Sequence, residues 1–400
     1  DGKLVLPGAI DVHCHVYDPK YTAHEDFYHG SMAAVFGGVT CFIDMPLRSY
    51  VDSASAVKEK VEAGERDSFC DFSLHGGMLS RENVSCIKEL ASLGVRSFKA
   101  FTCSPFYADD KTLLAAMFEA KRNGSTLVVH CEDEAIVSHS VEEFKASGRN
   151  RPVDHHLSRP LEAELLAVEK VLYYAKYSGC RVHIAHITSG RTADLIAEAR
   201  RQGVKVTCET CPHYLVYTVD DVEEQGPYLK MNPPLRSRED RELLWKALES
   251  GVIDAVATDH APCPRELKEV GWSDIWSAWG GIPGLETLFP LMFTYGFLRR
   301  KIPLEKIVEL LSTRPAKAFG LDYRKGCLAE GMDADLLVVD PKREKVVSGE
   351  EVHHLARWSA YEGLKLRGWP DLVVVRGRVV VREGQLEAKP KGKFVPMRGA

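Results

Sequence analysis

Two histidines one residue apart are the first side chains in this sequence that could bind a metal ion. They are His13 and His15, and alternation along a strand would place both imidazoles on the same side, within reach of one ion. Asp259 follows another short apolar run much later in the chain and would add a carboxylate. Two imidazoles and a carboxylate suit Zn²⁺. We therefore expect a metal site assembled from segments that are distant in sequence.

Three further residues could form a second metal site next to the first. His130 and His186 each follow an apolar run and would supply another imidazole pair. Lys99 lies inside an apolar run, where a charged amine is costly to bury. Desolvation would leave a neutral amine that can react with CO₂, and the resulting carbamate is an anion able to bridge two metal ions. The ordinary alternative is a lysine whose ammonium group extends to the surface.

This set of residues predicts metal-assisted hydrolysis. Two divalent ions that share a hydroxide would provide a nucleophile near neutral pH and would polarise a carbonyl group. Asp259 would be the catalytic base, taking the proton of the hydroxide and passing it to a leaving nitrogen. A mononuclear deaminase, with one zinc ion and a lysine that bridges nothing, is an alternative, and so is a barrel that serves only as an interaction protein.

The elements that must position these residues are short β-branched runs that alternate with helical segments. This alternation predicts an α/β fold, and a (β/α)8 TIM barrel is favoured over a doubly wound open sheet. The candidate ligands would lie at the carboxyl ends of the barrel strands, where barrel enzymes build their active sites. The eight expected strands are residues 8–13, 39–45, 69–75, 97–101, 127–131, 182–187, 204–208 and 255–259.

A second domain is expected after the barrel. Residues 1–325 would form the barrel, and residues 326–400 would form the C-terminal part of a small β-sandwich, because short β runs with Gly and Asp turns replace the helical pattern there. A sheet of two or three strands is marginal alone. We therefore expect it to pair with N-terminal strands that are absent from this chain, or to pack on the barrel.

Composition limits the classes of partner. The 400 residues are 45% hydrophobic and 27% charged, and 52 Lys and Arg stand against 57 Asp and Glu, so we expect no basic surface for nucleic acid. No apolar run reaches about 18 residues, so we expect no membrane partner. The start of the sequence does not resemble a signal peptide and the eleven cysteines are scattered, which favours a cytoplasmic protein with reduced thiols.

The sequence resembles the cyclic amidohydrolases, the family of hydantoinase, dihydropyrimidinase, allantoinase and dihydroorotase, along essentially its whole length. The resemblance implies that His13, His15 and Asp259 hold one Zn²⁺ and that His130 and His186 hold the other. It also implies that N6-carboxylated Lys99 and a hydroxide bridge the two ions. The motifs that carry it are LPGAIDVHCH at 6–15, GGVT at 37–40, DMP at 44–46, GVRSFK at 94–99, VHCED at 129–133, HIAH at 183–186, ETCPH at 209–213, MNPPLR at 231–236 and ATDHAP at 257–262.

Within this family the motifs resemble the allantoinase branch, which implies ring opening of allantoin to allantoate. Dihydroorotase is the first alternative, although Tyr17 and Leu47 stand where that branch has an Arg and an Asn. Hydantoinase or dihydropyrimidinase is the next, although Ser104 stands where that branch has a Tyr. The small cyclic amide or ureide substrate is expected to contact Asn232, Arg48, Tyr17, Ser104 and His260.

Several histidines and one glutamate outside the ligand set have other expected roles. Glu209 and His213 would either orient metal ligands or be satisfied polar groups of the core. Arg48 would either grip the substrate or be a solvated loop residue. We expect two adjacent pairs of histidines on the surface, namely His155 with His156 and His353 with His354.

The family resemblance also implies a homo-oligomer, a dimer or a tetramer.

Overall fold

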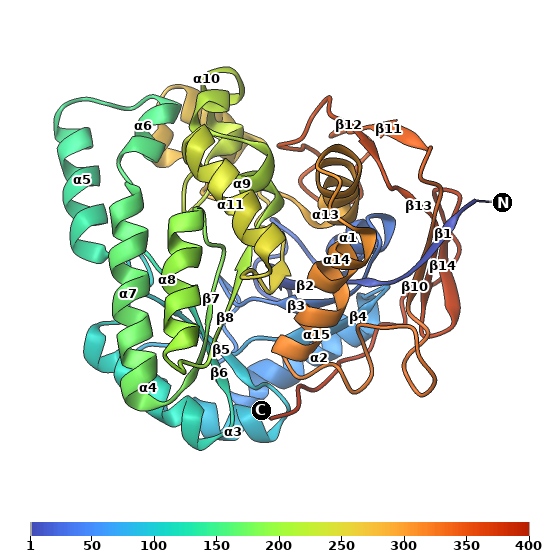
Figure 1. Cartoon of the computed structure of the whole chain (residues 1–400), viewed down its shortest axis with the longest axis horizontal. Helices are drawn as coiled ribbons and strands as arrows, with labels where there is room; N and C mark the ends of the chain where they lie inside the picture. The colour runs from blue at the N-terminus through green and yellow to red at the C-terminus, as the bar shows by residue number, and fades with distance from the viewer. Residues whose placement is uncertain (1, 400) are drawn as a thin grey trace.

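Eight parallel strands form a ring at the centre of the structure, a computed structural model that describes residues 2–399 (Figure 1). Each strand coincides with one of the expected runs to within a few residues, and the (β/α)8 barrel is confirmed. Nearly every strand residue is buried, because the ring is covered on both faces. The strands are β2 (Ala9–Cys14), β3 (Val39–Asp44), β4 (Asp71–Leu74), β5 (Ser97–Phe101), β6 (Thr126–His130), β7 (Arg181–Ile184), β8 (Val206–Thr210) and β9 (Ala255–Val256).

The ring closes at two seams that join a group of three strands to a group of five. Strands β2 to β4 pair in sequence order, and so do β5 to β9. A parallel bridge between Gly76 and Phe98 joins β4 to β5, and a second bridge between Cys14 and His260 joins β2 to the segment after β9. At the second seam the His15 N–H donates to the His260 carbonyl over 2.8 Å. This closure brings Asp259, three residues beyond the end of β9, beside the residues that end β2.

The helices between the strands form the outer layer. Several begin with a side chain that accepts a hydrogen bond from a free N–H of the first turn, for example Asp109 from Thr112 and Ser237 from Asp240. The main helices of this layer are α1 (Phe27–Phe36), α2 (Ala54–Asp67), α3 (Cys86–Ser92), α4 (Asp110–Arg122), α7 (Leu161–Ser178), α8 (Gly190–Arg201), α11 (Arg238–Ser250), α13 (Leu288–Leu291), α14 (Leu304–Val308) and α15 (Arg314–Ala318).

Further helices lie in the connections that follow the strands. One of them carries Leu267, a residue of the cavity that opens over the candidate ligands. These helices are α5 (Glu134–Ala146), α6 (Pro152–Leu157), α9 (Pro212–Val216), α10 (Val222–Gln225) and α12 (Glu266–Glu269).

A small antiparallel sheet lies beside the barrel, and the first strand of the chain belongs to it. Figure 1 shows the blue strand β1 among the red C-terminal strands. Residues 4–7, expected with the barrel, thus supply an edge strand that pairs with β10, with Leu4 opposite Val339. The strand order is β1 (Leu4–Pro7), β10 (Leu336–Val339), β13 (Pro370–Val375), β14 (Arg378–Arg382) and β15 (Gln385–Leu386), and β11 (Glu344–Val346) pairs separately with β12 (Lys365–Arg367).

The C-terminal segment leaves the small sheet and returns to the barrel. The Val395 N–H donates to the carbonyl of Phe72 over 2.8 Å, and the Met397 N–H donates to the carbonyl of Gly94 over 2.8 Å. Val395 and Met397 are buried with Val12 and other residues that fill the inside of the ring. Residues 391–398, expected in the small domain, therefore close the floor of the barrel, opposite the ends that carry the candidate ligands.

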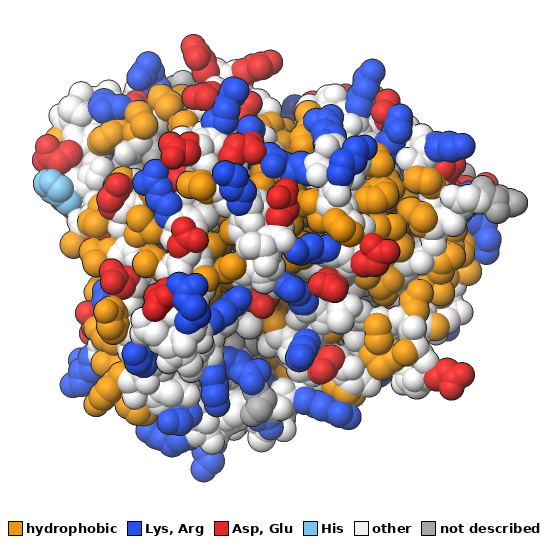
Figure 2. All heavy atoms as spheres, viewed as in Figure 1, with side chains coloured by type: hydrophobic (Ala, Val, Ile, Leu, Met, Phe, Trp, Pro, Cys, Tyr) orange, Lys and Arg blue, Asp and Glu red, His pale blue; other side chains and the backbone are white. Residues whose placement is uncertain are grey.

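The surface carries both signs of charge. On the face drawn in Figure 2, basic and acidic side chains are interspersed over the outer helices. None of the helices formed by residues 2–399 has the length and apolar character needed to span a membrane.

A buried lysine joins the barrel to the small sheet. The Lys325 ammonium lies 2.6 Å from a carboxylate oxygen of Asp71, on β4, and 2.6 Å from one of Asp335, which precedes β10. Asp333 is a third partner, at 3.0 Å. Burial opposes the charge, but the carboxylates outweigh it and raise the pKa of Lys325. The three carboxylates are close enough to hold a cation, and the ammonium already lies among them.

Removal of this ammonium should destabilise the whole fold. We expect Lys325→Met to lower the free energy of unfolding by about 3–5 kcal/mol, since it leaves Asp335 without a counter-charge and leaves the buried Asp71 with Arg376 alone. Urea unfolding followed by circular dichroism would measure the change. The control is Lys389→Met, because Lys389 is exposed. A loss below about 1 kcal/mol would contradict the prediction, since that is the value of a surface ion pair.

Candidate metal centre and substrate cavity

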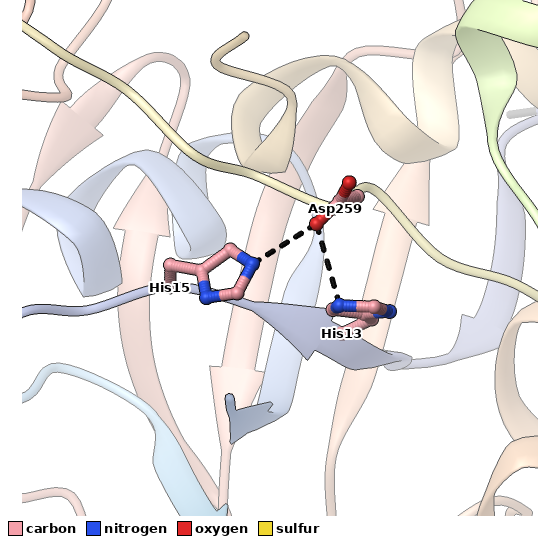
Figure 3. A group of neighbouring side chains, drawn as sticks. All are labelled: His13, His15 and Asp259. Atoms are coloured by element: carbon pink, nitrogen blue, oxygen red, sulfur yellow. Dashed lines mark hydrogen bonds and ion pairs between the residues drawn. The ribbon is translucent and has the colours of Figure 1, made fainter. Parts of the chain in front are cut away.

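The first candidate metal group unites the two ends of the barrel ring. His13 lies on β2, His15 lies just beyond it, and Asp259 follows β9 (Figure 3). The Oδ1 atom of Asp259 lies 3.3 Å from Nε2 of His13 and 3.0 Å from Nε2 of His15. Asp259 has a φ of 47°, a left-handed conformation that is uncommon for a residue with a side chain. The ring closure and this backbone conformation aim the carboxylate at both imidazoles.

Hydrogen bonds on the far side of each ring fix which nitrogen faces Asp259. The Nδ1–H of His15 donates to the carbonyl of Met45 over 2.8 Å. The Nδ1–H of His13 donates to Oε1 of Glu209 at the end of β8. Burial lowers the pKa of His13, which keeps its ring neutral. Each Nε2 therefore presents a lone pair to a carboxylate oxygen, and a cation between them would remove the repulsion.

The second imidazole pair lies next to the first group. His130 ends β6 and His186 follows β7, and Nδ1 of His130 lies 3.1 Å from Nε2 of His186. The ring centroids of His13 and His186 are 5.3 Å apart. Burial lowers the pKa of both His130 and His186, so both rings are neutral, the form that binds metal. His186 also has a left-handed backbone, with a φ of 35°.

Glu132 and Arg159 orient His130. The Nε2–H of His130 donates to Glu132 over 2.7 Å, and Arg159 donates to the two oxygens of that carboxylate over 3.0 and 2.5 Å. Burial would raise the pKa of Glu132, but Arg159 and His130 outweigh it and lower the pKa to about 2. The ionised Glu132 leaves Nδ1 of His130 as the nitrogen that faces His186.

Lys99 lies between the two groups. Its charge acts on the pKa of His13 in one group and on that of His130 and His186 in the other. Burial lowers the pKa of Lys99 to about 8, against the opposing effect of Asp259. Its Nζ atom has no hydrogen-bond partner among residues 2–399 and lies 4.8 Å from the centroid of the Phe101 ring.

The other buried lysines of the described chain all have partners. Lys60 and Lys325 are paired with carboxylates. Lys230 and Lys268 donate to backbone carbonyls. Lys99 differs from all four, because its amine is buried, unpartnered and surrounded by metal-ligand types.

A cavity of about 440 Å³ opens over the candidate metal groups. All six expected ligands line this cavity: His13, His15, Lys99, His130, His186 and Asp259. Three of the expected substrate-binding residues, Arg48, Ser104 and Asn232, also line it. The Oδ1 atom of Asn232 is buried and has no hydrogen-bond partner among residues 2–399, so it is available to a ligand. The guanidinium of Arg48 lies 5.6 Å from the centroid of the Trp279 ring, at the mouth.

Two of the expected substrate-binding residues do not reach the cavity. The His260 ring donates from Nε2 to Glu25 over 3.2 Å and accepts at Nδ1 from the Gly284 N–H over 3.0 Å. It faces away because it directly follows Asp259 and so points to the other side of the chain. Tyr17 is buried behind His15, with the ring centroids 6.2 Å apart.

The adjacent histidines are also mostly buried, contrary to expectation. His155 donates to the carbonyl of Met231 over 3.0 Å, and His156 accepts from the Leu235 N–H over 3.1 Å. His354 is buried as well, while His353 is half-buried and stacks on Phe36. The prediction was wrong because the segments that contain these pairs lie under other loops, a long-range arrangement without a local pattern.

The sequence analysis assigned no definite role to several residues that line the cavity or contact its histidines. Glu132 and Arg159 could have been found from their positions, since one lies two residues after His130 and the other precedes a proline at the start of α7. Glu209 was left between two roles, and its bond to His13 identifies it as a residue that orients a ligand. The aromatic and apolar lining gave no signal in the sequence; it comprises Leu47, Phe101, Phe106, Leu267, Trp276 and Trp279.

Known proteins resemble this chain over nearly its whole length. A sequence profile described as the Amidohydrolase family matches residues 4–380. An allantoinase of Rubrobacter xylanophilus is 40% identical over 401 residues, which cover 98% of this chain and 87% of that protein. An L-hydantoinase of Paenarthrobacter aurescens is 36% identical over 406 residues, with 99% and 88% covered.

Solved structures give the same result. An L-hydantoinase (dihydropyrimidinase) from Arthrobacter aurescens matches with a TM-score of 0.96 at 35% identity, covering 99% of this chain and 89% of that one. A D-hydantoinase (dihydropyrimidinase) from Thermus sp. matches with a TM-score of 0.94 at 31% identity, covering 100% and 89%. The resemblance drawn from the motifs is confirmed, and the chain belongs to the amidohydrolase family.

Proposed function

We propose that this chain is a binuclear zinc hydrolase that opens the ring of allantoin to give allantoate. The observation that carries the proposal is the set of imidazole lone pairs that face Asp259 and one another around the unpartnered amine of Lys99. We further propose that Lys99 is N6-carboxylated, because a neutral buried amine reacts with CO₂ and the carbamate supplies the missing anion. His13, His15 and Asp259 would hold one ion, and His130 and His186 the other.

The two ions, when bound, would lower the pKa of a water molecule and withdraw electrons from the amide carbonyl. Asp259 would take the proton of the attacking water and deliver it to the ring nitrogen as the C–N bond breaks. One of its oxygens faces the two histidines, and Figure 3 shows that the other points away from them. Glu209 and Glu132 would keep His13 and His130 in the orientations that this chemistry needs.

Two residues of the cavity wall would bind the ring and its substituent. Asn232 would pair with the ring amide, since its buried Oδ1 has no other partner in the described chain. Arg48 would hold a ureido oxygen with its planar guanidinium, which has no carboxylate partner among residues 2–399. The Ser104 hydroxyl donates to Glu134 over 2.7 Å, so Ser104 would shape the wall rather than donate to the substrate.

A second candidate substrate is a hydantoin with an apolar substituent. The observation that favours it is the aromatic lining of the mouth, where Phe106, Trp276 and Trp279 would pack against such a group. The identity to an L-hydantoinase supports the same alternative.

Initial rates on three substrates test the substrate assignment. We expect the zinc- and bicarbonate-supplemented protein to hydrolyse allantoin with a kcat/KM at least about tenfold above that for a 5-aryl hydantoin or for dihydroorotate, since about 1.4 kcal/mol of selective binding suffices. Faster hydrolysis of the aryl hydantoin would favour the second candidate. Turnover of dihydroorotate alone would show that Arg48 grips a carboxylate.

Replacement of Lys99 tests the bridge. We expect Lys99→Ala to bind at most one zinc ion per chain and to lose activity by about 100-fold or more, because the bridging anion is gone. Added formate or propionate should restore part of the zinc content and part of the activity. Metal analysis and rates would be compared with Lys246→Ala, whose lysine is exposed on α11. Two bound ions and normal rates without added acid would rule out the carbamate bridge.

Replacement of Asp259 tests the proton transfer. We expect Asp259→Asn to retain part of its zinc and to lower kcat by about 10²- to 10⁴-fold, the usual contribution of a general base. Asp194→Asn on α8 is the matched control, because Asp194 is exposed. A variant that keeps more than a few per cent of turnover would show that another group moves the proton.

We also propose that the chain forms a homo-oligomer. Leu166, Tyr173 and Tyr177 lie on one face of α7 and are 47%, 65% and 75% exposed, which supports contact with a second copy through that helix.

A further inference from the structure

One wall of the cavity is a segment without regular strand structure. Residues 276–280 all line the cavity, and they follow α12 through a series of short turns. Trp276 and Trp279 supply the largest side chains of this wall. A segment of this kind needs other contacts to keep a single conformation, because it has no ladder of backbone hydrogen bonds.

Two buried lysines bind the carbonyl groups of this wall. The Lys230 ammonium donates to the carbonyls of Ile275 and Ala278 over 2.6 Å each and to that of Trp276 over 3.3 Å. The Lys268 ammonium donates to the carbonyl of Trp279 over 2.9 Å. Four of the five carbonyls of residues 275–279 thus accept hydrogen bonds from the amino groups of two lysines. Burial lowers the pKa of Lys230 to about 8 and that of Lys268 to about 7.

The same two lysines are linked to each other. Lys268 donates to the backbone carbonyl of Lys230 over 2.7 Å, and the Gly281 N–H donates to that carbonyl over 3.1 Å. Gly281 must be a glycine here, since a Cβ atom would lie 2.5 Å from the carbonyl oxygen of Ala261. The wall is therefore hydrogen-bonded to the segment that contains Lys230, and at Gly281 it packs closely against Ala261.

Neither ammonium has a carboxylate partner within 4.0 Å in the part of the chain that the structure describes. Burial of an ammonium without a counter-charge is costly. The carbonyl dipoles that point at each ammonium offset this cost. The same hydrogen bonds therefore keep the lysine side chains buried and keep the backbone of the wall in place. Release of the wall would leave these carbonyls unpaired, and it would remove all three carbonyl partners of Lys230 and one of the two carbonyl partners of Lys268.

The indole nitrogens are fixed at the same time. The Trp276 Nε1–H donates to the carbonyl of Arg149 over 2.8 Å, and the Trp279 Nε1–H donates to that of Ala261 over 2.9 Å. Lys145 lies 5.5 Å from the centroid of the Trp276 ring. Both indoles have defined positions only while the backbone between them stays in place.

We propose that Lys230 and Lys268 are positioning residues for substrate binding, which act by holding the backbone of residues 275–280 so that Trp276 and Trp279 form a fixed wall. Neither lysine is hydrogen-bonded or ion-paired to a candidate metal ligand among residues 2–399, although Lys230 lines the cavity and Lys268 does not. Loss of either ammonium loosens the wall and weakens binding, while the metal groups and the chemical step stay intact. The kinetic part of this inference rests on the proposed hydrolase activity, and the structural part does not.

Hydrogen exchange tests the structural part without a substrate. In the unaltered protein we expect the amides of residues 275–281 to exchange about as slowly as those of α7 and at least about tenfold more slowly than those of the exposed segment 327–331. In Lys268→Met the exchange of residues 275–281 should rise by about tenfold or more, with α7 unchanged. Lys268→Arg, which keeps the charge, should restore part of the protection. Lys246→Met is the control on the surface.

Kinetics test the functional part. We expect Lys268→Met to raise KM by about tenfold and to change kcat by less than about threefold, with zinc content equal to that of the unaltered protein. If no cyclic amide is hydrolysed, the proposed activity fails, while exchange and zinc content still decide the role of the lysines.

Three results would overturn the inference. One is fast exchange of residues 275–281 in the unaltered protein, a measurement that remains informative even if the variants do not fold. Another is equal loosening of the wall and α7 in Lys268→Met, which would mean a general role in stability. The third is a fall in kcat with an unchanged KM.

Discussion

The seam between the first and last barrel strands is the contact on which the rest of the site depends. Asp11 on β2 accepts hydrogen bonds from the hydroxyl and the N–H of Thr258 over 2.5 and 3.2 Å, although the two residues are 247 positions apart. It also accepts from the N–H of His13 over 3.1 Å. A buried carboxylate with these three donors fixes the ends of both strands, so Asp259 meets His13 and His15 because the ring has closed.

The strands and the positions of the candidate metal ligands at their ends could be predicted because both leave a local pattern. A barrel strand is buried on both faces and reads as a short β-branched run, and its last residue points into the mouth. His13, Lys99 and His130 each lie at or near such an end. The pattern stops where the strand stops, which explains why Tyr17 and His260 were placed in the cavity and lie outside it.

Residues held by distant partners could not be predicted. The pairing of residues 4–7 with β10 and the return of residues 391–398 to the barrel floor both depend on long-range contacts. The buried position of His155 has the same cause. Side-chain type alone gave little, because the same lysine side chain serves three purposes here according to its neighbours. The amine of Lys99 has no hydrogen-bond partner in the part of the chain that the structure describes. Lys325 is paired with carboxylates, and Lys230 and Lys268 donate to backbone carbonyls.

The position of β1 has a consequence for the order in which the molecule can assemble. Its residues leave the ribosome before those of the barrel, but β10, the strand with which they pair, is made after the whole barrel. The edge strand therefore stays unpaired during most of synthesis, and its exposed backbone is open to wrong partners in that interval. Long-range pairing of this kind slows folding. The small sheet is accordingly completed last, although it contains the first strand of the chain.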